Sequence, residues 1–365
     1  MKRKWILYGA AVMVTAAVFF LVWDVMTHKD YIDAFSGATP VALQREVPDG
    51  LRFTVEGKVK QKYTFSSHSF RLLAKARIRT PEVTPAGEIM GTYIYTGIPV
   101  LYILEGVVPL KTGKDAFDRP LDMVAVFHSA TGKTACFSYG ELVMAGDSFP
   151  VTLAYHREPL MPTKGPGAYT KNKYRENIRG LRLIAPAEQD NTRWLDDVVR
   201  LTLEAIPTPD HLLPPLQKWK NCSSETVTCL DGENQRLASV ENVPLIQVSN
   251  WFRVGHGRGI KGDRLAAASG FHLRTFLMNN FPGTLPAAPG DFFLFVGCDG
   301  YRCIFSSREI FCTPAGDTFM MIDTIDGVKP KGGQTVGPMA DFFVDRDVWG
   351  VTHILKVKLK VPLIP

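Results

Sequence analysis

The sequence predicts an α+β fold of two tandem, strand-rich domains with short helices, placed after one N-terminal transmembrane helix. Three observations lead to this prediction: an internal repeat, many short apolar stretches separated by turn residues, and an uncharged apolar run near the N-terminus. Alternating apolar and polar residues between Gly, Pro and Asn clusters are typical of strands. Short strands mixed with a few short helices in each half indicate two similar α+β domains.

The repeat joins residues 124–142 (VAVFHSATGKTACFSYGEL) to residues 292–310 (FFLFVGCDGYRCIFSSREI) at an offset of 168, without a gap. Five of the nineteen positions are identical, whereas random pairing gives roughly one, so the repeat indicates a duplicated unit. Each copy predicts a buried strand, a turn at Thr131-Gly132 or Asp299-Gly300, a second strand and a helix. The helix begins with Ser-x-x-Glu, a pattern typical of a capping box.

The apolar run extends from Trp5 to Trp23 and contains nineteen residues without a charge, enough to cross a bilayer as a helix. Lys and Arg occupy positions 2–4, so the N-terminus is expected in the cytoplasm and the rest of the chain in the periplasm or outside the cell. A cleaved signal peptide is the alternative. No small-x-small cleavage site follows the run, so we favour a single-pass anchor in the cell membrane.

Five segments follow from these signals. Residues 1–28 are expected to be a cytoplasmic tip and anchor, and residues 29–50 a tether. Residues 51–205 form the first domain, residues 206–242 a Pro-rich linker with little periodicity, and residues 243–365 a second, diverged domain.

The composition indicates a globular protein, with 45% hydrophobic and 21% charged residues in a chain of 365. The net charge of +6 is modest and the basic residues are spread along the chain. The sequence contains no helix-turn-helix, zinc-finger or basic-aromatic signature, so no nucleic acid is expected as a partner.

A series of short motifs then points to a family. A Gly-Ile-Pro-Val helix start at residues 97–100 precedes Leu-Ala-Tyr at 153–155 and Gly-Leu-Arg-Leu-Ile-Ala-Pro at 180–186. In this order the motifs resemble the oxidoreductase molybdopterin-binding domain of the sulfite oxidase family. The resemblance covers residues 51–203 and, more faintly, 243–359. It implies tandem molybdopterin-binding domains, and the molybdenum cofactor (molybdopterin) as a cofactor.

The sequence departs from that family at the metal ligand. The family binds molybdenum through a cysteine upstream of the Gly-Val-Pro turn, whereas residues 76–83 hold no cysteine. In the second half Ser249 or Asn250 falls nearest the ligand position. A serine oxygen is a much harder ligand than a thiolate, so no metal ligand is assigned and redox catalysis is in doubt.

Five residues are candidates for cofactor or ligand binding. Arg182 matches the arginine of the family segment and would fork two N–H donors onto a phosphate, or lie on the polar face of a strand. His128 and His156 end two strands that would open onto one pocket; packed or surface histidines are the alternative. Arg258 belongs to a Gly-rich loop at 251–259 that would wrap an anion or form a flexible hairpin. Ser249 completes the set.

The six cysteines leave several disulfides open. Outside the cytoplasm Cys222 would pair with Cys229, and Cys303 with Cys298 or Cys312. The sequence contains no Cys-x-x-Cys motif, so thioredoxin-like chemistry and c-type haem lack sequence support.

Two functions from different classes remain. The first is a membrane-anchored, extracytoplasmic molybdopterin-dependent oxidoreductase, whose competence the missing cysteine puts in doubt. The second is a non-catalytic envelope protein of the same fold that binds a ligand or a partner. A small anionic ligand or an electron-transfer partner is expected, and the membrane is contacted through Trp5 to Trp23.

Overall fold

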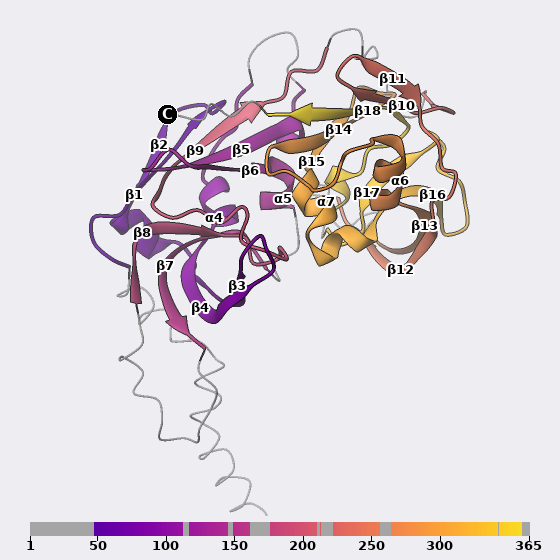
Figure 1. The fold of residues 1–365 in the computed structure, drawn as a ribbon. Coiled ribbons are helices and arrows are strands. Elements are labelled where there is room, and N and C mark those ends of the chain that lie inside the picture. Colours follow the sequence, from indigo (N-terminus) through magenta and orange to yellow (C-terminus); the bar gives the residue numbers. More distant parts are fainter. Residues whose placement is uncertain are drawn as a thin grey trace, which may run out of the picture. The chain divides into compact units, whose positions relative to one another are not determined.

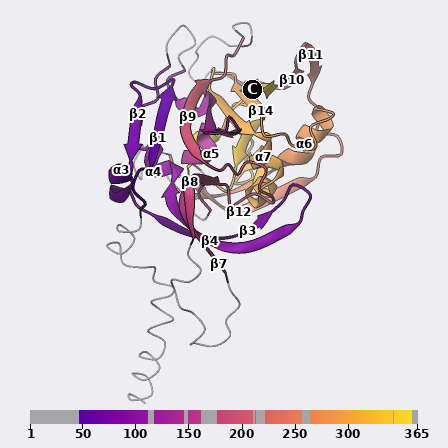
Figure 2. The same cartoon turned by 60° about the vertical axis from the view of Figure 1, so that its left-hand side comes forward.

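The computed structural model describes residues 47–111, 117–144, 149–160, 176–209, 212, 222–255, 264–341 and 343–359. The chain divides into two compact units, residues 1–47 and 48–365. The second unit contains all the helices and strands given below, and its ribbon is drawn in Figures 1 and 2.

The second unit consists of two repeats of similar element order. The first repeat contains β1 (Arg52–Gly57), β2 (Tyr63–Ser66), α3 (Ser67–Leu72), β3 (Ala76–Val83), β4 (Ile89–Pro99), α4 (Val100–Leu104), η1 (Pro120–Asp122), β5 (Met123–Ser129), β6 (Thr134–Ser138), α5 (Tyr139–Val143), β7 (Thr152–Pro159), β8 (Glu176–Ile184) and β9 (Val198–Ala205). The second contains β10 (Thr228–Asp231), β11 (Asn234–Leu237), β12 (Leu245–Arg253), β13 (Arg264–His272), α6 (Leu273–Asn280), β14 (Asp291–Gly297), β15 (Arg302–Ser306), α7 (Ser307–Phe311), η4 (Pro314–Thr318), β16 (Phe319–Ile325), β17 (Thr335–Pro338), η5 (Val344–Arg346) and β18 (Val351–Lys358).

Each repeat builds one five-stranded and one four-stranded sheet. The five-stranded sheets have the orders β2-β1-β9-β5-β6 and β11-β10-β18-β14-β15, and the four-stranded sheets have the orders β3-β4-β7-β8 and β12-β13-β16-β17. In both five-stranded sheets the last strand of the repeat pairs in parallel with the first, β9 with β1 and β18 with β10. The two repeats therefore have the same topology. β10 and β11 lie within residues 206–242, the segment that was expected to be a Pro-rich linker.

The duplicated stretch folds in the same way in both copies. β5, β6 and α5 begin at residues 123, 134 and 139, and β14, β15 and α7 begin 168 residues later. The turn glycines Gly132 and Gly300 have φ values of 84° and 81°, a left-handed conformation that favours glycine. The predicted capping boxes are confirmed at both helix starts, with Ser138 and Ser306 as N-cap residues.

A second pair of equivalent glycines lies where β4 and β13 bend before their helices. A Cβ atom on Gly97 would stand 2.4 Å from the Leu153 carbonyl oxygen, and one on Gly270 would stand 2.3 Å from the Met321 carbonyl oxygen. The ladder shifts register at both positions, so each glycine permits a close approach of backbones at a bulge. The helix start expected at residues 97–100 is confirmed: β4 ends at Pro99 and α4 begins at Val100.

The two five-stranded sheets share a core. Val124 and Val126 of β5 pack with Phe292 and Leu294, their equivalents on β14. The opposite faces of the same hairpins face the core of their own repeat, where Phe residues stack edge to face. These pairs are Phe127 with Phe137 and Phe295 with Phe305, at ring-centroid distances of 5.6 and 5.5 Å. Equivalent faces of the two repeats therefore meet each other.

The predicted α+β fold with sulfite-oxidase-like domains is wrong. Of the described residues 48% are in β-strands, and the four sheets form a four-bladed, β-propeller-like arrangement. No helix among the described residues exceeds the eight residues of α6. The error has a physical reason: Ser-x-x-Glu and Gly-Ile-Pro-Val signals mark where a helix starts but say nothing of its length, and here each helix covers only the end of a hairpin.

The predicted single-pass membrane location is also not supported. In the described part of the chain, no helix has the length and apolarity needed to cross a bilayer. The run from Trp5 to Trp23, on which that prediction was based, lies outside the described residues.

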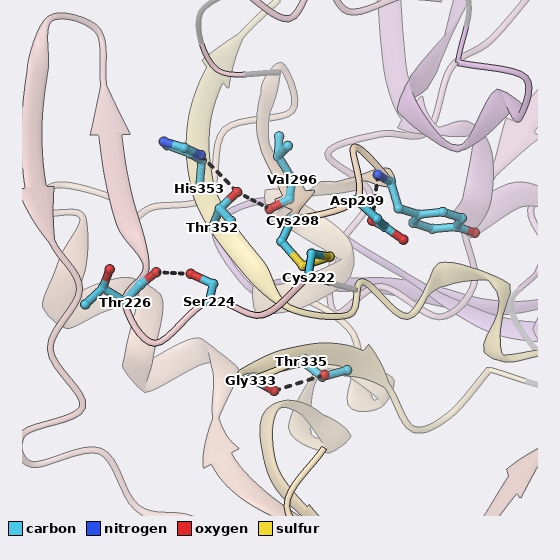
Figure 3. Close-up of a disulfide and its surroundings, with 11 residues drawn as sticks. Cys222, Ser224, Thr226, Val296, Cys298, Asp299, Gly333, Thr335, Thr352 and His353 are labelled. Atoms are coloured by element: carbon cyan, nitrogen blue, oxygen red, sulfur yellow. Dashed lines mark hydrogen bonds between the residues drawn. A yellow bond between two sulfur atoms is a disulfide. The ribbon is translucent and has the colours of Figure 1, made fainter. Parts of the chain in front are cut away.

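One disulfide joins Cys222, before β10, to Cys298, in the turn after β14, with a Cα–Cα distance of 5.8 Å (Figure 3). The alternatives expected for these cysteines are therefore wrong, because Cys229, Cys303 and Cys312 are free thiols. Spacing along the chain suggested the pairing of Cys222 with Cys229, but Cys229 lies on β10 with its side chain buried in the core of the second repeat. The bond ties the start of the second repeat to its duplicated hairpin.

Candidate functional site

The starts of α5 and α7 lie beside each other where the two repeats meet (Figure 1). At each start the serine hydroxyl accepts a hydrogen bond from the backbone N–H of the glutamate three residues later. The N–O distance is 3.1 Å both for Glu141 with Ser138 and for Glu309 with Ser306. Such caps satisfy amide groups that the short helices leave unpaired.

The two capping boxes also exchange hydrogen bonds with each other. The Ser306 hydroxyl donates to the Glu141 carboxylate at 2.5 Å, and the Ser138 hydroxyl donates to the Glu309 carboxylate at 3.1 Å. All four side chains are buried. The site therefore has an approximate twofold relation in which each repeat completes the hydrogen bonding of the other.

Two arginines in equivalent places hold these carboxylates. Arg193 Nη1 lies 2.7 Å from Glu141 Oε1, and Arg346 Nη1 lies 2.8 Å from Glu309 Oε2. Both arginines precede the last strand of their repeat by five residues, β9 in one case and β18 in the other. Each guanidinium also lies over a phenylalanine of the duplicated hairpin, at 3.9 Å from the Phe137 centroid for Arg193 and at 5.1 Å from the Phe305 centroid for Arg346.

Further carboxylates extend the network from both arginines. Arg346 donates to both oxygens of Asp341, at 2.5 and 2.7 Å. Arg193 Nε lies 2.6 Å from Glu188, whose other oxygen lies 2.7 Å from Arg308 Nε. Arg308 then reaches Asp190 at 2.6 Å. These bidentate and charge-assisted contacts are the strong kind of hydrogen bond.

Burial changes the proton affinity of the carboxyl groups. Loss of water raises the pKa of Glu141 to about 7, against the opposing effect of the Arg193 charge. Burial likewise raises the pKa of Glu309 and of Asp341, and in both cases the nearby Arg346 counteracts it. Removing an ionised carboxyl from water disfavours its charged form, so these groups keep their protons to higher pH than exposed carboxyls do.

A cavity of about 460 Å³ opens on this network. Charged residues of both repeats line it, namely Glu141, Glu188, Arg193, Glu309, Asp341 and Arg346. Apolar side chains form other walls, among them Leu101, Phe149, Val151 and Phe319. The volume lies within the range of roughly 300–1,000 Å³ that is typical of small-molecule sites.

Four of the five residues predicted from the sequence lie away from this cavity. His128 is on β5, His156 and Arg182 are on the paired strands β7 and β8, and Ser249 is exposed on β12. None of these four residues is among those that line the cavity. His156 and Arg182 share a sheet, whereas His128 and Ser249 each lie in a different one. Arg258 lies outside the described residues.

Arg182 is engaged within its own repeat. Its Nη1 lies 3.0 Å from Glu82 Oε1 and its Nε lies 3.1 Å from Asp196 Oδ1. The guanidinium also stacks over Tyr95 and Trp194, at 5.7 and 5.4 Å from the ring centroids. These contacts direct the donors onto protein carboxylates, with which a pterin phosphate would have to compete.

His128 makes a local contact: its Nε2 lies 3.1 Å from Thr202 Oγ1 on β9. Burial and the positive charge of Arg200 lower its pKa. His156 is buried on β7. In the described part of the chain, no group of His, Cys, Asp and Glu is arranged to hold a metal ion. Binding of a molybdopterin stays a prediction, as do the roles of the five residues.

The ionisable residues of the cavity are not among the five predicted site residues. Glu141 and Glu309 were visible as identical residues of the repeat, but only as helix caps. Arg193 and Arg346 stand five residues before the last strand of each half, where no motif marks them as ion-pair partners. One signal could have identified these four residues. In both repeats the same glutamate of the duplicated stretch is followed by an arginine at the same distance before the last strand.

Comparisons with known proteins give no family. No protein-family model matches the chain, and no curated protein matches it. A solved structure, the sulfane dehydrogenase SoxCD from Paracoccus pantotrophus, is 10% identical over 82% of this chain and 77% of that chain, with a TM-score of 0.29. A likeness this slight carries no argument about function. The resemblance to the sulfite oxidase family is therefore corrected: no family model supports it, and the four-sheet β architecture differs from the predicted domains.

Proposed function

We propose that the protein binds a small molecule in the cavity between its two repeats, and that binding is its function. The cavity itself supports this proposal, because it combines apolar walls with a charged end formed by both repeats. Ligand sites in proteins commonly have this composition, with a few polar groups that orient an otherwise apolar contact. This corresponds to the ligand-binding alternative of the two functions that the sequence left open.

The charged end is built before any ligand arrives. Arg193 and Arg346 are 2% and 1% exposed, and both are fixed by carboxylates on more than one side. Side chains held in this way lose little further entropy when a ligand binds, which favours affinity. A redox role and an electron-transfer partner stay predictions that the geometry does not address.

Filling the cavity tests the proposal. Ala187 lines the cavity and is half-buried, so Ala187→Trp places an indole ring in it. Ala86→Trp is the matched control, because Ala86 is exposed in a turn between β3 and β4 and does not line the cavity. The full-length protein and both variants are screened by thermal shift against a library of compounds of about 8 to 15 heavy atoms, a size suited to a cavity of this volume.

We expect compounds that raise the melting temperature of the wild type and of Ala86→Trp, and that lose their effect on Ala187→Trp. A library without such compounds would remove the basis of the proposal. Compounds that stabilise all three proteins equally would show that binding takes place elsewhere.

A further inference from the structure

The cavity has an excess of acidic groups. Four carboxyls and two guanidinium groups line it. Arg308 and Asp190 connect to them through Glu188, which gives five carboxyls and three arginines in the whole network. With every group ionised the network would carry two uncompensated negative charges in a buried place. Such charges are costly unless a proton or another cation neutralises them.

The arginines are turned toward the protein carboxylates and not toward the open space. Arg346 directs its Nε and Nη2 to Asp341 and its Nη1 to Glu309. Arg193 directs its Nε to Glu188 and its Nη1 to Glu141. An anionic ligand would have to compete with these bonds, so the network is poorly suited to anions.

The Asp341 carboxylate retains capacity to accept further hydrogen bonds. An ionised carboxylate offers about four lone-pair positions. Asp341 accepts one N–H on each oxygen from Arg346, and the charge of Arg346 is the one that acts on it. The remaining lone pairs of this residue suit a donor with several hydrogens. An ammonium group offers three N–H donors and a compact positive charge.

We infer that the ligand carries a positively charged amino group, bound by Asp341 with Glu309 and Glu141, and an apolar body that packs on the Leu101, Phe149 and Val151 wall. This inference rests on the proposed function and specifies the chemical class of ligand. It accounts at once for the acidic excess, for the direction of the arginines and for the apolar walls.

Binding of such a ligand is linked to protons. Because burial raises the pKa of Glu141 to about 7, this carboxyl is largely protonated at pH 6 in the free protein. A cation beside it favours the ionised form, so the proton leaves when the ligand binds. Affinity should therefore increase between pH 5 and pH 7, by up to about tenfold per pH unit where one full proton is released.

Three probes of nearly equal shape test the charge preference on the full-length protein: 2-phenylethylamine, 2-phenylethanol and 3-phenylpropionate. We expect calorimetric titration at pH 7 to show binding of the amine at least tenfold tighter than that of the other two. In buffers of different ionisation enthalpy, the amine should release up to one proton at pH 6 and the alcohol none. Equal affinity for the three probes, or a preference for the carboxylate, overturns the inference.

Variants separate this inference from the proposed function. Asp341→Asn should lose at least tenfold in affinity for the amine and keep its affinity for the alcohol. Asp317→Asn is the matched control, since this side chain is 65% exposed and pairs with Arg274 outside the cavity.

If the alcohol binds the wild type but not Ala187→Trp, and the amine has no advantage, the cavity binds ligands and only the charge preference fails. If no probe binds the wild type, and the library finds none, both fail. The wild-type comparison remains decisive should Asp341→Asn not fold.

Discussion

The hydroxyl of Ser306 donates a hydrogen bond to the carboxylate of Glu141 in the other repeat, at an O–O distance of 2.5 Å. The reciprocal bond from Ser138 to Glu309 makes the contact two-sided. A motif that usually serves one helix therefore also joins the two halves of the protein. The acceptors are buried carboxyl groups, and hydrogen bonds to such groups in their ionised form contribute more than neutral ones.

The first prediction concerns this contact. Ser306→Ala removes a helix cap, which costs about 1 kcal/mol, and a buried bond to a carboxylate, which costs about 1.5–3 kcal/mol. We expect the free energy of unfolding to fall by about 2–4 kcal/mol, measured by denaturant titration.

Ser66→Ala is the matched control, because Ser66 caps α3 in a capping box with Ser69, a residue of the same helix. Its loss should be about 1 kcal/mol. Equal losses in the two variants would mean that the bond between repeats contributes nothing.

The second prediction concerns the glycine between Ser138 and Glu141. A Cβ atom on Gly140 would stand 2.4 Å from the Arg346 Cδ atom of the other repeat. Gly140→Ala therefore displaces a buried arginine that holds two carboxylates, and overpacking of this kind costs about 1–3 kcal/mol. The measurement is again denaturant unfolding.

Gly106→Ala provides the comparison, since a Cβ there meets nothing closer than the Ile103 carbonyl oxygen at 3.6 Å. That variant should unfold within about 0.5 kcal/mol of the wild type. A tolerated Gly140→Ala would show that Arg346 moves away without loss.

The five identities of the repeat each have a structural reason. The glycines at 132 and 300 allow the left-handed turn, and the phenylalanines at 127 and 295 and at 137 and 305 form the aromatic pair of each core. The serines at 138 and 306 and the glutamates at 141 and 309 cap the helices. Local signals of this kind could be predicted from the sequence, because each depends on residues within one hairpin.

The rest depended on contacts between distant residues. A capping box predicts bonds within four residues, whereas Ser306 and Glu141 are 165 positions apart. The ion pair of Arg193 with Glu141 likewise needs the fold to bring β9 to the duplicated hairpin. Arg182 gives a further example: Glu82 on β3 pairs with it within the sheet, a contact that the motif around Arg182 does not predict. The spacing within a single motif does not identify partners that the fold brings together from distant parts of the chain.

The third prediction concerns pH. The folded pKa of Glu141 is raised above its unfolded value of 4.5 to about 7, so the folded state holds a proton that the unfolded state releases. The stability from this group is fully present below pH 4.5 and is lost as pH rises through 7. The shift corresponds to about 3 kcal/mol.

Glu141→Gln keeps the shape of the side chain and removes its titration. Measured by denaturant unfolding from pH 4.5 to 8, the stability of the wild type should fall relative to that of the variant across this range. Curves that remain parallel would show that Glu141 titrates alike in the folded and unfolded states.

The fourth prediction concerns the disulfide between Cys222 and Cys298. It closes a loop of 76 residues, and the loss of loop entropy from the unfolded chain corresponds to about 4–5 kcal/mol. The variant with both cysteines changed to serine should lose stability of this order, measured by thermal and denaturant unfolding. Reduced wild type should match that variant, and a reductant should leave the variant itself unchanged, because its remaining cysteines are free thiols in the folded protein. A reductant that destabilises both proteins alike would show that the bond contributes nothing.

The bond also ties the residues just before β10 to the turn after β14. Its loss should therefore expose the amides of β10 and β11 to hydrogen exchange first, while those of the first repeat keep their protection.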